Sequence, residues 1–160
     1  MSDQSLRGLL IAILIVSGAS LTMSVTQVAL TLRGMTHRAT SLPARYSPQQ
    51  LAKIAASVTE PYNRGDADAI YNRLDDAIKL QLGHDKVIAS VARLKSLWGN
   101  VDSATYESFR ELPTDGGSPS YQLNYSVRLS GRDVSSGTLQ INVLDKPDGP
   151  SLLGFLLISR

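Results

Sequence analysis

The sequence predicts an α+β domain in which the helices come first and an antiparallel sheet follows. Between residues 47 and 98 the apolar residues recur every three or four positions, which is typical of helices packed on one side. From residue 104 onward they recur at every second position, with short turns between the runs, which is typical of half-buried strands. A run of helices followed by a run of strands indicates an α+β fold rather than an alternating α/β fold.

The first helix of this domain is predicted to begin at residue 47, where three residues form a start signal. Ser47 is the expected N-cap, Pro48 suits the first helical position, and Gln50 completes a capping box. Pro61 is expected to kink or end the helix, because proline lacks the N–H group that an interior turn requires. The apolar residues that fall on one face are Leu51, Ile54, Ala55, Val58 and Tyr62.

Two further helices are expected before the sheet. Gly65 is the expected stop of the first helix, and Asp66 is the expected cap of a short second helix. A third helix follows, which we expect His84 or Asp85 to cap and Gly99 to end. The inward-facing residues are predicted to be Ala69, Ile70 and Leu74 in the second helix, and Val87, Ile88, Val91, Leu94, Leu97 and Trp98 in the third.

Four strands are predicted in the second half of the domain, over residues 104–112, 121–129, 139–143 and 152–158. The second alternates most regularly, with aromatic and aliphatic residues on one side and polar residues on the other. The fourth is almost unbroken in its apolar character, so both of its faces are expected to be covered. Turn residues such as those at 146–150 separate neighbouring strands, which favours an antiparallel meander.

The amino-terminal part of the chain has a different character. Residues 8–32, between Arg7 and Arg33, carry no charge. As a helix they would rise by about 1.5 Å per residue and cover the roughly 30 Å hydrocarbon core of a bilayer. We therefore expect a tail at 1–7, a transmembrane helix or signal-anchor at 8–33, a linker at 34–46 and the globular domain at 47–160.

Two other interpretations of the apolar segment stay open. The run 9–16 and the small residues at 17–19 also fit a cleaved signal peptide, which would leave a soluble exported domain. A buried soluble helix fits less well, because the segment is long and has no polar face. The apolar character resumes at residues 25–32, which a cleaved signal would not need, and this favours the anchor.

The orientation of the anchor is read from the flanking charges. Arg33, Arg38 and Arg45 follow the segment and by themselves would place the domain in the cytoplasm. A short tail before a single early hydrophobic segment instead favours export of a long downstream domain. We expect a single-pass protein of the inner membrane with its domain on the periplasmic side.

The composition argues against several functional classes. The chain is 42% hydrophobic and 19% charged, which is typical of a folded protein. Residues 47–160 hold 12 Lys or Arg against 13 Asp or Glu, a net charge of −1, so nucleic-acid binding is not expected. The chain has no cysteine, and the histidine and carboxylates of the domain show no metal-ligand spacing. We therefore predict neither a metal nor a cofactor.

Three stretches of the domain resemble the NTF2-like superfamily, in particular its small bacterial domains. They are Tyr62–Asp66 continuing to Tyr71, Leu94–Gly99, and the closing strand Leu153–Ser159. The resemblance implies three helices packed into the concave face of a curved antiparallel sheet, with a conical cavity between them. Enzymes of this fold place a carboxylate, a histidine or a tyrosine inside that cone.

The residues available for chemistry inside such a cone are few. His84 is the only histidine at 47–160, and Asp85 follows it directly, so the two side chains do not readily converge as a catalytic dyad. We expect a capping role for them and predict no catalytic residue. Tyr62, Tyr71, His84 and Trp98 are the candidates for lining a ligand pocket, although aromatic residues at this spacing are more often plain core.

The polar side of the predicted sheet is the expected interface. Its exposed residues are predicted to include Gln122, Asn124, Arg128, Gln140 and Asn142. We expect a membrane-anchored, non-enzymatic accessory protein of the bacterial cell envelope that contacts protein partners, or a second copy of itself, through this face. The short tail, single span and domain resemble VirB8-like components of bacterial secretion machines in architecture. The alternative is a small-ligand-binding protein or weak enzyme that takes a small hydrophobic ligand into the cavity.

Overall fold

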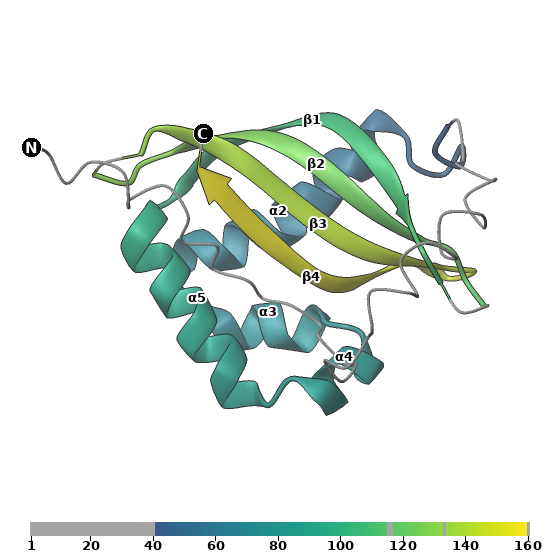
Figure 1. Ribbon diagram of the computed structural model, residues 1–160, viewed down its shortest axis with the longest axis horizontal. Coiled ribbons are helices and arrows are strands. Elements are labelled where there is room, and N and C mark those ends of the chain that lie inside the picture. Colours follow the sequence, from purple (N-terminus) through teal and green to yellow (C-terminus); the bar gives the residue numbers. More distant parts are fainter. Residues whose placement is uncertain (1–40, 115–116, 133, 160) are drawn as a thin grey trace, which may run out of the picture.

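The computed structural model describes residues 41–114, 117–132 and 134–159. Its elements are α2 (Pro48–Arg64), α3 (Ala67–Arg73), α4 (Asp76–Gln81), α5 (His84–Trp98), β1 (Val101–Leu112), β2 (Ser120–Leu129), β3 (Ser136–Lys146) and β4 (Gly149–Ser159) (Figure 1). The predicted tail at 1–7, the anchor at 8–33 and the linker up to residue 40 lie outside the described residues. Within the described ranges, no helix combines the length and the hydrophobicity that crossing a membrane requires.

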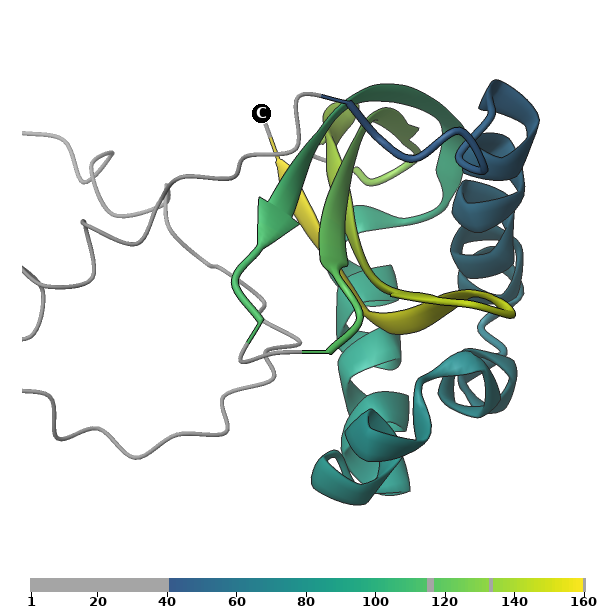
Figure 2. The same cartoon turned by 90° about the vertical axis from the view of Figure 1, so that its right-hand side faces the viewer.

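The strands form one antiparallel sheet in the order β1-β2-β3-β4, which confirms the predicted meander and the α+β class. The described helices all lie on one side of this sheet (Figure 2). Leu123 of β2 and Ile141 of β3 are paired neighbours and are fully buried on this helix-facing side. Tyr125, on the same side, donates a hydrogen bond from its hydroxyl to the Leu51 carbonyl of α2 at 3.0 Å. The other side is called the outer side.

Helix α2 starts as predicted and ends later than its proline suggests. Ser47 Oγ accepts a hydrogen bond from the Gln50 N–H at 3.2 Å, and Pro48 occupies the first turn. The helix does not end at Pro61, one of the two outcomes predicted for that residue, but continues to Arg64. Gly65 then caps it with a φ of 70°, a left-handed conformation that glycine adopts without strain. The inward face predicted for this helix is buried.

The region between residues 66 and 82 contains two short helices where the sequence pattern predicts one. Asp66 caps α3, as predicted. Asp75 interrupts the helical region, because its N–H donates a hydrogen bond to the Leu152 carbonyl of β4 at 2.7 Å. Its carboxylate accepts a hydrogen bond from the Ala77 N–H at 3.1 Å and so caps the start of α4. The prediction of three helices in the domain is therefore wrong, since four lie within the described residues.

Helix α5 begins directly at His84, after Gly83, and no side chain caps its first turn. The expectation that His84 or Asp85 caps this helix is therefore wrong. The His84 imidazole lies beside the Asp68 carboxylate of α3 instead, so it is not available to the first-turn N–H groups. Gly99 ends the helix with a φ of 68°, as predicted.

The predicted inward face of α5 is only partly correct. Val87, Val91, Leu94 and Trp98 are buried, whereas Ile88 and Leu97 are 36% and 46% exposed. Helix α5 packs against α3 and α2 at the edge of the helical layer, so only a narrow strip of its surface is covered. In the second predicted helix region, Ile70 and Leu74 are buried as expected and Ala69 is half-buried.

The strands extend beyond their predicted limits, and the last one is less covered than expected. Strand β3 runs from Ser136 to Lys146, where residues 139–143 were predicted. Leu153 and Leu156 of β4 are half-buried and Ile158 is 38% exposed. The prediction that both faces of this strand are covered is therefore wrong, because β4 is an edge strand and no described helix lies over the outer side.

Three contacts join segments that are distant in the sequence. Tyr46, at the end of the predicted linker, is buried in the core, and its hydroxyl donates to Asp145 Oδ1 at 3.0 Å. Arg45 Nη2 lies 2.5 Å from the other oxygen of the same carboxylate. Asn63 belongs to the first stretch that resembles the NTF2-like superfamily. Its Nδ2 donates to the Val101 carbonyl and its Oδ1 accepts from the Val101 N–H, both at 2.8 Å, which joins the end of α2 to the start of β1.

Candidate functional site

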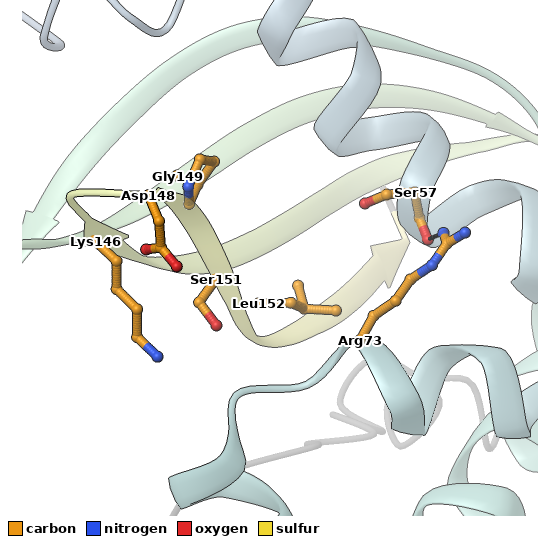
Figure 3. Close-up of a pocket in the computed structure, with 8 residues that line it drawn as sticks. Ser57, Arg73, Lys146, Asp148, Gly149, Ser151 and Leu152 are labelled. Atoms are coloured by element: carbon orange, nitrogen blue, oxygen red, sulfur yellow. Dashed lines mark hydrogen bonds between the residues drawn. The ribbon is translucent and has the colours of Figure 1, made fainter.

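A polar cleft of about 460 Å³ opens between the β3–β4 hairpin, the edge strand β4 and the helices α2 and α3 (Figure 3). Its lining comes from three parts of the chain and consists of Ser57, Arg73, Lys146, Asp148, Gly149, Pro150, Ser151 and Leu152. None of the four residues predicted to line a ligand pocket belongs to this lining. The cleft was therefore not foreseen from the sequence.

One wall of the cleft is fixed by a buried carboxylate behind it. Asp75 Oδ2 accepts hydrogen bonds from Lys146 Nζ at 2.5 Å and from Ser151 Oγ at 2.8 Å. The hydrogen bond from Lys146, assisted by those from Ser151 and Ala77, lowers the pKa of Asp75 although its burial opposes this. Asp75 in turn raises the pKa of Lys146. Both groups are therefore charged at neutral pH.

The opposite wall carries a cation that the backbone of α2 holds in place. Pro61 has no N–H, so the Ser57 carbonyl four residues earlier lacks its usual helical donor. Arg73 Nη1 donates a hydrogen bond to that carbonyl oxygen (Figure 3). Among the described residues, no carboxylate forms an ion pair with Arg73. Arg73 is thus an exposed cation whose direction is set by Ser57.

These side chains suit binding better than catalysis. Lys146 is protonated at neutral pH, and Asp75 raises its pKa further, so it cannot serve as a general base toward Ser151. The Ser151 hydroxyl donates a hydrogen bond to Asp75, and a carboxylate of lowered pKa is a weak base. Across the described ranges, no group of three or more histidine, cysteine or acidic side chains is arranged to hold a metal ion. The cleft offers charges and hydrogen-bonding groups without an activated nucleophile.

Two of the predicted pocket residues, Tyr71 and His84, lie together at an exposed corner of the helical layer. His84 Nε2 lies 2.6 Å from Asp68 Oδ1, and its Nδ1 lies 3.7 Å from Asp85 Oδ1. The Tyr71 ring packs edge-on against the imidazole, with 4.8 Å between ring centroids. The side chains of His84, Asp68 and Asp85 are 45%, 71% and 104% exposed, so these ion pairs contribute little to stability.

Replacing His84 with glutamine is expected to change the free energy of unfolding by less than about 1 kcal/mol, because exposed ion pairs are screened by water. Urea unfolding of the full-length chain, followed by circular dichroism, measures this change. A loss above about 2 kcal/mol would contradict the assignment of an exposed, structural contact. Loss of partner binding at unchanged stability would assign a functional role to His84.

The other two predicted pocket residues, Tyr62 and Trp98, lie in the hydrophobic core. The Tyr62 ring is 1% exposed and packs against Phe155, with 6.3 Å between ring centroids. Burial raises the pKa of Tyr62 to about 12. The Tyr62 hydroxyl and the Trp98 Nε1 are buried without a hydrogen-bond partner. The structure therefore separates the four predicted residues into an exposed pair and two core residues.

Four neutral amide side chains form a compact group on the outer side of the sheet. Gln122 and Asn124 lie on β2, and the register places them opposite Asn142 and Gln140 of β3. These four residues are called the amide block. They alternate with fully buried residues of the same strands, so they belong to the side without helices. Arg128, the fifth predicted interface residue, lies farther along β2 and is exposed. The prediction of exposure is wrong for Gln122, which is 7% exposed beneath the Arg110 side chain that bonds it, and Asn124, Gln140 and Asn142 are half-buried.

The hydrogen-bonding capacity of the amide block is only partly used. Arg110 donates to Gln122 Oε1 at 2.6 Å, and Asn124 Nδ2 donates to Ser108 Oγ at 3.2 Å. The Oδ1 atoms of Asn124 and Asn142 are shielded from solvent and accept no hydrogen bond. An unpaired buried acceptor costs about 1–3 kcal/mol, so the face holds two amides whose hydrogen bonds are incomplete in the isolated chain.

The comparisons with known proteins add a distant likeness. No protein-family model matches the chain, and no curated protein matches it in sequence. Among solved structures, the chain is similar to a candidate aromatic ring hydroxylase from Novosphingobium aromaticivorans. The two share 13% sequence identity with a TM-score of 0.45, over 74% of this chain and 92% of that chain. A likeness at this level transfers neither family, activity nor site to this chain.

Proposed function

We propose that the chain is a membrane-anchored, non-enzymatic binding protein of the cell envelope, whose domain contacts a partner protein through the outer side of its sheet. The uncharged segment within residues 8–33 supports the anchor. The order of helices followed by a four-stranded meander supports an NTF2-like domain. In this proposal the domain lies on the periplasmic side of the inner membrane.

The amide block is the observation that carries the proposal. Its neutral side chains lie on the two inner strands of the sheet, on the side that no described helix covers. The cores of protein interfaces are poor in charged residues. Each amide holds both donors and an acceptor, so a side chain that turns outward offers a docked protein a two-way hydrogen bond. Rotation of the Asn124 and Asn142 side chains toward the partner would give their unpaired oxygens the hydrogen bonds that they lack in the isolated chain.

An apolar strip continues the face beside the amide block. Leu156 of β4 is the paired neighbour of Gln140, and Ile158 of β4 is the paired neighbour of Thr138. Leu156 is half-buried and Ile158 is 38% exposed. A polar centre flanked by partly exposed aliphatic residues supports a protein contact better than a purely solvated face.

Site-specific photo-crosslinking in intact cells tests this proposal. A photoreactive amino acid at Gln140 of the full-length chain is expected to give a discrete crosslinked product. The same amino acid at Glu60, an exposed position of α2 on the helical side, is the matched control and is expected to give none. Products at Glu60 without products at Gln140 would place the contact on the helices and overturn the proposed face.

A further inference from the structure

We propose that the cleft between β4, α2 and α3 binds a small organic monocarboxylate, whose anionic group is held by the Arg73 guanidinium. This ligand site lies apart from the outer side of the sheet and does not depend on the partner contact proposed for that face. It also lies apart from Tyr62 and Trp98, which are core residues.

The first support for the proposal is the orientation of the Arg73 side chain. One Nη1 hydrogen is directed to the Ser57 carbonyl, which Pro61 leaves without a helical donor. A guanidinium has five N–H donors, so the remaining ones stay available to a ligand. The contact with Ser57 restrains the long side chain before any ligand arrives, which reduces the entropy lost on binding. Arg73 is therefore an oriented cation in the lining of the cleft, at the end that α2 borders (Figure 3).

The charges around the cleft select a monoanion. Lys146 lies at the far end of the cleft from Arg73 (Figure 3), and its charge is balanced by Asp75 at 2.5 Å. Asp148 adds an exposed carboxylate to the lining. Arg73 is thus the one lining cation in the described chain that forms no ion pair with a carboxylate. Asp148 lies at the Lys146 end of the cleft (Figure 3), where its charge opposes a ligand with a second negative group. A guanidinium can hold a carboxylate or a phosphate through paired N–H donors. The single unbalanced positive charge of the lining fits the monoanion better than the dianion.

The rest of the lining favours an organic acid with an apolar part. Pro150 and Leu152 add apolar surface to the cleft. The Ser57 and Ser151 hydroxyls donate to Ile54 and Asp75, so toward a ligand they offer mainly lone pairs. A volume of about 460 Å³ lies within the range of small-molecule sites, roughly 300–1,000 Å³. A short aliphatic carboxylate satisfies both the cation and the apolar surface.

The test is a titration of the full-length chain in deuterated detergent with hexanoate, followed through the backbone amide signals of Gly149 and Ser151. Saturable shifts with a Kd on the order of 1 mM are expected, because the site is open to water. Hexanol, which has the same chain length and no charge, is expected to bind at least about tenfold more weakly. Inorganic phosphate is expected to bind more weakly than hexanoate, because Asp148 repels the second charge.

Variants of two lining residues test whether hexanoate binds in the cleft. Arg73→Gln is expected to weaken hexanoate binding about tenfold, whereas Arg93→Gln, the same change at an exposed position of α5, is expected to leave it unchanged. Asp148→Asn is expected to tighten binding about two- to threefold, and this variant decides the question if Arg73→Gln fails to fold. Equal binding of hexanoate and hexanol, tighter binding of phosphate, or unchanged Kd values in both cleft variants would overturn the proposal.

Discussion

Replacing Trp98 with alanine is expected to lower the free energy of unfolding by about 3–5 kcal/mol, the usual cost of removing a large buried aromatic side chain. Trp98 is 8% exposed and forms the last residue of α5, directly before the turn into β1. That turn has no room to adjust, since a Cβ on Gly99 would lie 2.7 Å from the Gly131 nitrogen. The cavity left by the indole therefore cannot collapse easily.

Trp98→Phe is the matched control for this prediction. The indole Nε1 has no hydrogen-bond partner, so replacing it removes volume without breaking a hydrogen bond. We expect this variant to cost clearly less than Trp98→Ala, because the phenyl ring leaves a smaller cavity. Urea unfolding followed by circular dichroism measures both variants, because the tryptophan fluorescence is lost. A stable Trp98→Ala variant that no longer bound a small ligand would favour a pocket around this residue over the core assignment.

Replacing Asp75 with asparagine is expected to lower the free energy of unfolding at pH 7 by about 2–4 kcal/mol. The change removes the counter-charge of Lys146 and leaves one acceptor oxygen for the two hydrogen bonds from Ser151 and the Ala77 N–H. The expected loss stays below that for a fully buried ion pair, because the Lys146 side chain is 38% exposed and can be solvated. Asp76→Asn is the control, because that carboxylate is 94% exposed.

The contribution of Asp75 also predicts a pH dependence. Its pKa is lowered in the folded chain, so the unfolded chain binds the proton more readily near the ordinary value of 3.8. The stabilisation is therefore complete above that value and is lost as the pH falls through the lower pKa of the folded state. The difference between wild type and Asp75→Asn should shrink on acidification. A difference that stayed constant from pH 7 to pH 2 would contradict the assigned ion pair.

The architecture was predictable because local signals agree with the packing. Ser47, Asp66 and Gly99 cap helices as their positions in the sequence indicate. The regular alternation around Leu123 and Ile141 predicted the buried side of the sheet. The break before the second short helix was missed because the Asp75 N–H bonds the carbonyl of Leu152, a residue far along the chain, and no local pattern records that contact. Asp75 then caps the helix through the Ala77 N–H.

The candidate sites also differ in whether the sequence could predict them. Alternation within β2 and β3 was enough to place Gln122, Asn124, Gln140 and Asn142 on one polar side of the sheet. The cleft depends on Arg73 meeting a carbonyl that Pro61 leaves free, and on Lys146 meeting Asp75. Each of these contacts joins distant segments, so spacing along the sequence carries no sign of it.

The most direct test of the proposed function is the photo-crosslink at Gln140, read together with the location and intact mass of the product. We predict a crosslinked product in the inner-membrane fraction whose chain keeps residues 1–33, with none from the Glu60 control. A product of cleaved mass in the soluble fraction would contradict the anchor. The absence of any crosslink at Gln140 in cells that express the folded chain would contradict the role of the sheet face.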